Sequence, residues 1–184
     1  MSDVSANNKR IAKNTLMLYI RMLFSMAVSL YTSRVILHTL GVEDYGIYNV
    51  VGGIITMFTF INGAMVSSTQ RYLNFELATG NAEKLRSIFN TSIQIHAIIA
   101  LSIILLGETV GLWFLLNQLV IPEARMTAAI WVYQCSILSC VVGIMSTPYN
   151  ADIIAHEKMS AFAYISILDV CLKLLIVYLL VVSP

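Results

Sequence analysis

The sequence predicts an all-α membrane protein with about five transmembrane helices, and three observations support this prediction. Hydrophobic residues make up 58% of the 184 residues and charged residues only 11%, with a mean hydropathy of +0.80. A soluble domain of this size needs more charged surface. Apolar runs of about 20 residues recur, a length that crosses a hydrocarbon core of roughly 30 Å. Basic residues gather on alternate connections between those runs, as in multi-pass membrane proteins.

Two regions are expected: a polar cytoplasmic tail, 1–13, and a transmembrane helical domain, 14–184. The apolar runs predict spans at 14–37, 45–68, 85–116, 122–147 and 161–182. The second helix is expected to continue as a polar extension past Arg71.

Turn and cap residues mark several predicted helix ends. Gly80 and Asn81 are typical of one helix ending before the next begins. Pro122 and Glu123 suit the first turn of the fourth helix, because a missing N–H costs nothing there and a negative charge faces the positive helix end. Pro148 predicts a stop or a kink at the end of that helix.

The distribution of basic residues predicts the orientation. With a cytoplasmic N-terminus, the outer connections hold only Arg125. The cytoplasmic side then holds Lys9, Arg10, Lys13, Arg71, Lys84, Arg86 and Lys158. This bias favours a cytoplasmic N-terminus. The acidic turn at Glu43 and Asp44 is then extracytoplasmic.

Three basic residues lie inside predicted spans, and each has two interpretations. Arg34 is close to the outer end of the first span, where snorkelling to the interface competes with a binding role. Lys173 follows Asp169 by four residues, an order that favours an ion pair on a helix; the alternative is a transport role. Arg21 lies about 10 Å into the first span, and no acid in its own helix reaches it. Snorkelling is strained at that depth, which favours a functional role.

Helical periodicity collects polar residues on one side of each of the first two spans. At about 100° per residue, Arg21 shares a face with Asn14, Ser25 and Thr32. The second span carries a stripe of small and polar residues: Asn49, Gly52, Thr56, Thr59, Gly63 and Gln70. Close helix packing explains most of such a stripe. The competing hypothesis is a polar wall for a shared interior, which makes Arg21, Arg34, Ser25, Thr32, Asn49 and Thr56 candidate substrate-binding residues.

Other chemistry has little support in the sequence. A phosphate-binding loop that ends in Gly-Lys-Ser/Thr is missing, which argues against an ATP motor. His156 and Glu157 lack the second histidine of a zinc helix, and His96 is more often a packing residue than a proton relay. The cysteines, which lie in predicted spans without a CxxC spacing, are expected to be packing residues. We expect no catalytic residues, no cofactor, no metal site and no nucleic-acid partner.

Several segments resemble bacterial O-antigen and polysaccharide flippases. "SRVILHTLGVEDYGIYNVVGGI" is similar to their first helical hairpin, and "TPYNADIIAHEKMSAFAYISILDVCLKLL" to their fourth and fifth helices. The segment "ETVGLWFLLNQLVIPEARMTAA" is similar to the region between their third and fourth helices. These flippases are lipopolysaccharide biosynthesis proteins of the multidrug/oligosaccharidyl-lipid/polysaccharide exporter superfamily.

The resemblance implies a two-lobe exporter in the bacterial inner membrane whose central cavity faces each side in turn. Its partners would be the bilayer and its cargo, an undecaprenyl-pyrophosphate-linked oligosaccharide. The family's cavities are cationic, so Arg21 and Arg34 would be the counterparts that meet the pyrophosphate. The planar fork of arginine binds phosphate oxygens in a bidentate manner.

The chain also departs from that family, because it resembles an incomplete N-terminal lobe. Alternating access needs one half to move against another, so the missing C-terminal helices or another chain would supply the remainder. Two other functions stay open. A cation-drug antiporter needs an unpaired carboxylate, whereas Asp169 is beside Lys173. A membrane-embedded glycan polymerase or transferase needs a long extracytoplasmic loop.

Overall fold

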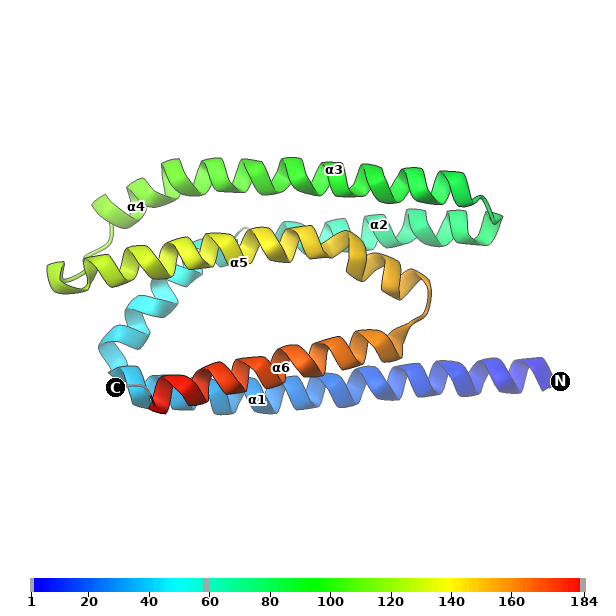
Figure 1. Cartoon of the computed structure of the whole chain (residues 1–184), viewed down its shortest axis with the longest axis horizontal. Coiled ribbons are helices and arrows are strands. Elements are labelled where there is room, and N and C mark those ends of the chain that lie inside the picture. The colour runs from blue at the N-terminus through cyan, green and yellow to red at the C-terminus, as the bar shows by residue number, and fades with distance from the viewer. Residues whose placement is uncertain (1, 58–59, 183–184) are drawn as a thin grey trace. The chain divides into compact units, whose positions relative to one another are not determined.

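The computed structural model describes residues 2–57 and 60–182 and shows an all-α membrane protein (Figure 1). The helices are α1 (Ser2–Thr56), α2 (Phe60–Thr79), α3 (Ala82–Leu106), α4 (Leu112–Asn117), α5 (Glu123–Ala155) and α6 (Met159–Val182), with a π-helix η2 (Gly107–Gly111) between α3 and α4. Four stretches are long and apolar enough to cross a membrane: Asn14–Thr56, Ala82–Asn117, Glu123–Ala155 and Met159–Leu179. The chain is therefore a multi-pass protein.

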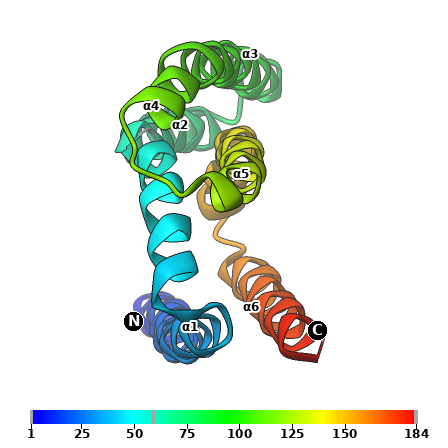
Figure 2. The same cartoon turned by 90° about the vertical axis from the view of Figure 1, so that its left-hand side faces the viewer.

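The chain forms two compact units. The terminal unit consists of residues 1–42 and 157–184, and the central unit of residues 43–156. In the terminal unit, α6 runs parallel to the first part of α1 (Figure 1). In the central unit, α3 runs antiparallel to α2 and α5, and these three helices pack together (Figures 1 and 2).

Gly41 separates two helical segments of α1. Its φ of 78° and ψ of 172° lie outside the helical region, and glycine adopts a positive φ at little cost. The sequence predicted a longer break between 37 and 45, but residues 38–40 and 42–44 are helical. Within this stretch, Gly41 carries the non-helical dihedrals that separate the two helical segments.

The predicted second span at 45–68 is divided in the structure. Its first part belongs to α1, which ends at Thr56, and its second part to α2, which begins at Phe60. The division follows Gly52 and Gly53 and then the β-branched run 54–56, all of which have poor helix propensity. The described residues of the small and polar stripe lie on two elements, with Asn49, Gly52 and Thr56 on α1 and Gly63 and Gln70 on α2. Thr59 lies outside the described residues. The predicted extension past Arg71 is confirmed, since α2 reaches Thr79.

The turn between α2 and α3 follows the sequence signals. Gly80 has a φ of 72°, and its N–H donates to the Glu76 carbonyl at 3.1 Å. The Asn81 side chain caps α3 by accepting the Lys84 N–H at 3.0 Å. These interactions satisfy backbone groups that helix ends leave unpaired.

α5 begins as predicted but ends later than predicted. It starts at Glu123 directly after Pro122, and it continues through Pro148 to Ala155. The predicted end at 147 is therefore wrong. Membrane helices tolerate proline where nearby side chains bond the disturbed backbone. Close to the Ile144 carbonyl, which Pro148 leaves without its usual helical N–H, the hydroxyls of Ser146 and Thr147 donate to the Gly143 carbonyl at 2.7 and 3.3 Å.

An ion pair in the central unit joins two segments that the sequence placed on the outer side. Arg125 Nε lies 3.1 Å from Asp44 Oδ1. Asp44 follows the Gly41 break, and Arg125 lies in the first turn of α5. Because Asp44 and Arg125 are in contact, the segment that follows Gly41 and the start of α5 lie on the same side of the membrane.

Candidate functional site

Arg21 contacts α6 within the terminal unit. Its Nη1 donates to Ser166 Oγ at 3.0 Å, and its guanidinium carbon lies 4.5 Å from the centre of the Phe162 ring. Ser166 Oγ in turn donates to the Phe162 carbonyl at 2.8 Å, which leaves its lone pairs for the arginine. Phe162 and Ser166 are four residues apart and share one face of α6.

These contacts hold the guanidinium without neutralising it. Its Nε is buried and has no hydrogen-bond partner among the described residues. Guanidinium carries five N–H donors, and the ring and hydroxyl beside it carry no negative charge. The site therefore keeps a positive charge and free donors within a membrane span, a combination that suits an anion.

The other candidate residues of the terminal unit lie along the same segment of α1. Ser25 and Thr32 are half-buried, and Thr32 Oγ1 is buried with no hydrogen-bond partner in the described part of the chain. Arg34 lines a groove of about 770 Å³ together with His38. The opposite wall is apolar and comes from α6: Leu174, Val177, Tyr178 and Val181. This geometry fits both interpretations of Arg34, a snorkelling residue and an anion-binding residue.

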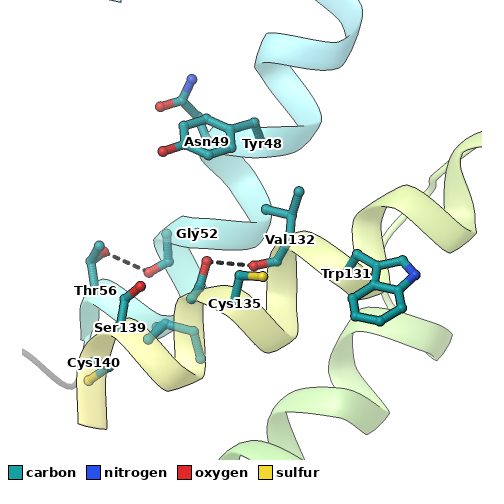
Figure 3. Close-up of a pocket in the computed structure, with 12 residues that line it drawn as sticks. Tyr48, Asn49, Gly52, Thr56, Trp131, Val132, Cys135, Ser139 and Cys140 are labelled. Carbon is teal, nitrogen blue, oxygen red and sulfur yellow. Dashed lines mark hydrogen bonds between the residues drawn. The ribbon is translucent and has the colours of Figure 1, made fainter. Parts of the chain in front are cut away.

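Asn49 and Thr56 line a second groove, in the central unit, with a volume of about 780 Å³. Figure 3 shows the two walls: the last turns of α1 carry Tyr48, Asn49, Gly52 and Thr56, and α5 carries Trp131, Cys135, Ser139 and Cys140. Asn49 Nδ2 donates to the Tyr45 carbonyl, and Thr56 Oγ1 to the Gly53 carbonyl, both at 2.8 Å. Small side chains and hydroxyls keep this groove open and mildly polar.

The candidate residues belong to two units, and three of them line a groove: Arg34 in the terminal unit, and Asn49 and Thr56 in the central unit. Arg21, Ser25, Thr32 and Arg34 belong to the terminal unit, and Asn49 and Thr56 belong to the central unit. Sequence reasoning missed Phe162 and Ser166. The sequence signal for them was an aromatic residue followed four positions later by a hydroxyl residue, a spacing that puts both on one helix face.

Lys173 and Asp169 form an ion pair on α6, with Nζ 2.7 Å from Oδ2. Both side chains are more than half exposed in this chain.

Removing one partner of the Asp169–Lys173 pair leaves a lone charge in a membrane span, whereas removing both leaves none. We therefore expect Asp169→Asn combined with Lys173→Met to accumulate in membranes to a higher level than either single variant. Immunoblots of membrane fractions measure this. Equal or lower accumulation of the double variant would show that Asp169 and Lys173 do not neutralise each other in the membrane.

The cysteines and the potential metal ligands are placed as follows. Cys140 is buried in the core of the central unit, as expected of a packing residue, but Cys135 and Cys171 are exposed. Within residues 2–57 and 60–182, no cluster of three His, Cys, Asp or Glu side chains is arranged to hold a metal ion.

Comparison with protein-family models, with curated proteins and with solved structures finds no match to this chain.

Proposed function

We propose that this chain is part of an exporter that moves an undecaprenyl-pyrophosphate-linked oligosaccharide across the bacterial inner membrane. The observation that carries the proposal is the Arg21 site: an intramembrane guanidinium that contacts Ser166 and Phe162 and has a buried Nε free to donate. Pyrophosphate offers several anionic oxygens, and arginine binds such oxygens through two parallel hydrogen bonds.

The charges of the spans favour an anionic cargo over a cationic drug. Asp169 is paired with Lys173, and Glu108 accepts a hydrogen bond from Gln134 Nε2 at 3.1 Å. A cation-drug antiporter needs a carboxylate that is free to exchange its partner, and these two are engaged. The segments between the helices of the central unit, 80–81 and 118–122, are too short to carry the catalytic loop of a glycan polymerase.

Direct binding tests this function. The full chain, in lipid nanodiscs, is titrated with undecaprenyl pyrophosphate and with uncharged undecaprenol. We expect the pyrophosphate to bind more tightly, and Arg21→Ala to weaken its binding about tenfold or more, because hydrogen bonds to charged groups contribute roughly 1.5–3 kcal/mol. Arg86→Ala, an exposed arginine on α3, is the matched control. Equal affinity for the two lipids would remove the pyrophosphate from the proposal.

The same proposal includes a cytoplasmic N-terminus. Val120 and Ala82, exposed at opposite ends of the 82–117 stretch, are suitable reporters. Single cysteines there, in a chain without the natural cysteines, should react from opposite sides with a membrane-impermeant maleimide, with Val120→Cys labelled in intact cells. Labelling of Ala82→Cys from outside would contradict this orientation.

A further inference from the structure

His96 lies fully buried near the middle of the helical stretch 82–117, with 0% of its surface exposed. It is about 21 Å from Ala82 along the helix axis. Ionisable side chains at such depth in a membrane are rare and mark proton or substrate pathways. The sequence alone favoured a packing role, so the hydrogen bonds of the ring decide which interpretation holds.

These hydrogen bonds define which ring nitrogen carries the proton. Nδ1 lies 2.7 Å from the Ser92 carbonyl oxygen. Because a carbonyl can only accept, Nδ1 carries the proton and donates it. In the neutral ring, Nε2 is then an acceptor with a free lone pair. Nε2 is buried and has no hydrogen-bond partner among the described residues. The ring can therefore bind a proton at Nε2.

Two hydroxyls connect the Nδ1 side of the ring to a groove. Ser92 Oγ lies 3.4 Å from Nδ1 and 3.1 Å from Thr69 Oγ1. Ser92 and Thr69 both line a groove of about 240 Å³ between α2 and α3. The groove also includes Ser87 and Thr91, and Ser87 is only five residues from the start of α3. Hydroxyls thus line a route from the first turns of α3 toward the buried histidine.

Apart from His96 itself, the buried residues in the described part of the chain include no ionic side chain that could compensate a charge on this ring. Two contacts set the register of α3 against α5. The ring of Phe89 packs edge-on against that of Tyr149, and the Tyr133 hydroxyl donates to the Gly107 carbonyl. The buried α5 residues at this level are Ile137, Cys140, Ile144, Thr147 and Pro148. α2 contributes buried Thr69 and Leu73, with Tyr72 on the groove, and α1 contributes Val51 and Ile55 to the same core. Cys140 and Tyr72 are the ionisable side chains in this set, which contains no Asp, Glu, Lys or Arg.

We propose that His96 is a proton-binding site that takes up a proton at Nε2 and releases the Nδ1 proton through Ser92 and Thr69 into the groove between α2 and α3. One proton enters at Nε2 and one leaves from Nδ1, which gives the Nε2-protonated tautomer. The starting tautomer returns when Nδ1 takes a proton back through the same hydroxyls and Nε2 releases its own. A buried imidazolium without a counter-ion is costly. Its formation therefore favours an arrangement of α2, α3 and α5 in which water reaches the ring. The role of His96 in coupling proton movement to export rests on the proposed function. Its proton binding is measured without the lipid-linked glycan.

Nitrogen NMR of the full chain in nanodiscs tests the site. His38→Gln with His156→Gln leaves His96 as the only histidine. The neutral ring should show the Nδ1-protonated tautomer, and the ring should gain a second proton, at Nε2, when the sample is acidified. In Thr69→Val with Ser92→Ala, the Nδ1 proton should exchange with water more slowly. A ring that stays neutral throughout would overturn the site, and unchanged exchange would overturn the route.

The reactivity of the groove toward a thiol reagent tests the coupling to helix movement. Ser87→Cys, in a chain without the natural cysteines, should react faster with a water-soluble thiol reagent at about pH 5 than at about pH 8, relative to free cysteine under the same conditions. His96→Gln should remove this acceleration, whereas His156→Gln, in the exposed α5–α6 turn, should keep it. Loss of the acceleration in both variants, or in neither, would overturn the coupling. Failure of pyrophosphate binding at Arg21 would leave these measurements unaffected.

Discussion

Replacing Arg21 with alanine should abolish export of the lipid-linked glycan while the level of the protein in the membrane stays the same. The test is made in the complete proposed exporter. A charged residue at mid-membrane costs about 2.5–3.5 kcal/mol of insertion free energy on translocon scales, and less near the interface. Its removal therefore leaves insertion unharmed or improved. Loss of export then reports the anion site, because the described residues offer Arg21 no acidic partner that its removal would leave unpaired.

A series of substitutions at the same position separates binding from snorkelling. Arg21→Lys should restore export in part, since it keeps the charge but loses the planar fork. Arg21→Glu should fail, because it repels phosphate. Ser166→Ala should reduce export mildly, because it removes the hydroxyl that holds Nη1. If Arg21 only snorkels, alanine and glutamine keep near-normal export, and normal export by Arg21→Ala at normal protein levels would remove this residue from the site. Surface glycan, read on immunoblots, measures the outcome, with Arg86→Ala as control.

The second large effect is expected at Gly111, where α3–η2–α4 meets α5. A Cβ at this position would overlap Tyr133 Oη. Tyr133 is fully buried, and its hydroxyl donates to the Gly107 carbonyl at 2.7 Å. The ring therefore cannot move away without breaking that bond. Overpacking costs about 1–3 kcal/mol, and the lost hydrogen bond about 1 kcal/mol more. We expect Gly111→Ala to lower the unfolding temperature in detergent and the level in membranes.

A second substitution should relieve this clash. Tyr133→Phe removes the hydroxyl that the new methyl group would meet. Gly111→Ala should therefore cost less in a Tyr133→Phe chain than in the natural one, a coupling that a double-mutant cycle measures. Gly143→Ala on α5 is the control, because no atom lies within 4 Å of its added Cβ. Equal costs of Gly111→Ala in the two backgrounds would show that Tyr133 does not restrict this position.

The class of the protein and several of its helix ends could be predicted from local sequence. The hydropathy predicted an all-α membrane protein, which the structure confirms. Gly80, Asn81 and Pro122 mark real helix ends, since each acts through its own backbone dihedrals or a neighbour a few residues away. The proximity of Asp169 and Lys173 has the same local origin, because residues four apart share one face of a helix.

Tertiary packing decided the rest. Sequence periodicity shows which face of a helix is polar, but not which helix lies against that face. The Ser166 and Phe162 contacts of Arg21 bridge more than a hundred residues of sequence, and the burial of His96 depends on the packing of α2 and α5 against α3. Pro148, a breaker by its own chemistry, lies within a continuous helix. Local rules could not predict this, because burial against neighbouring helices stabilises a stretch that its own residues would end.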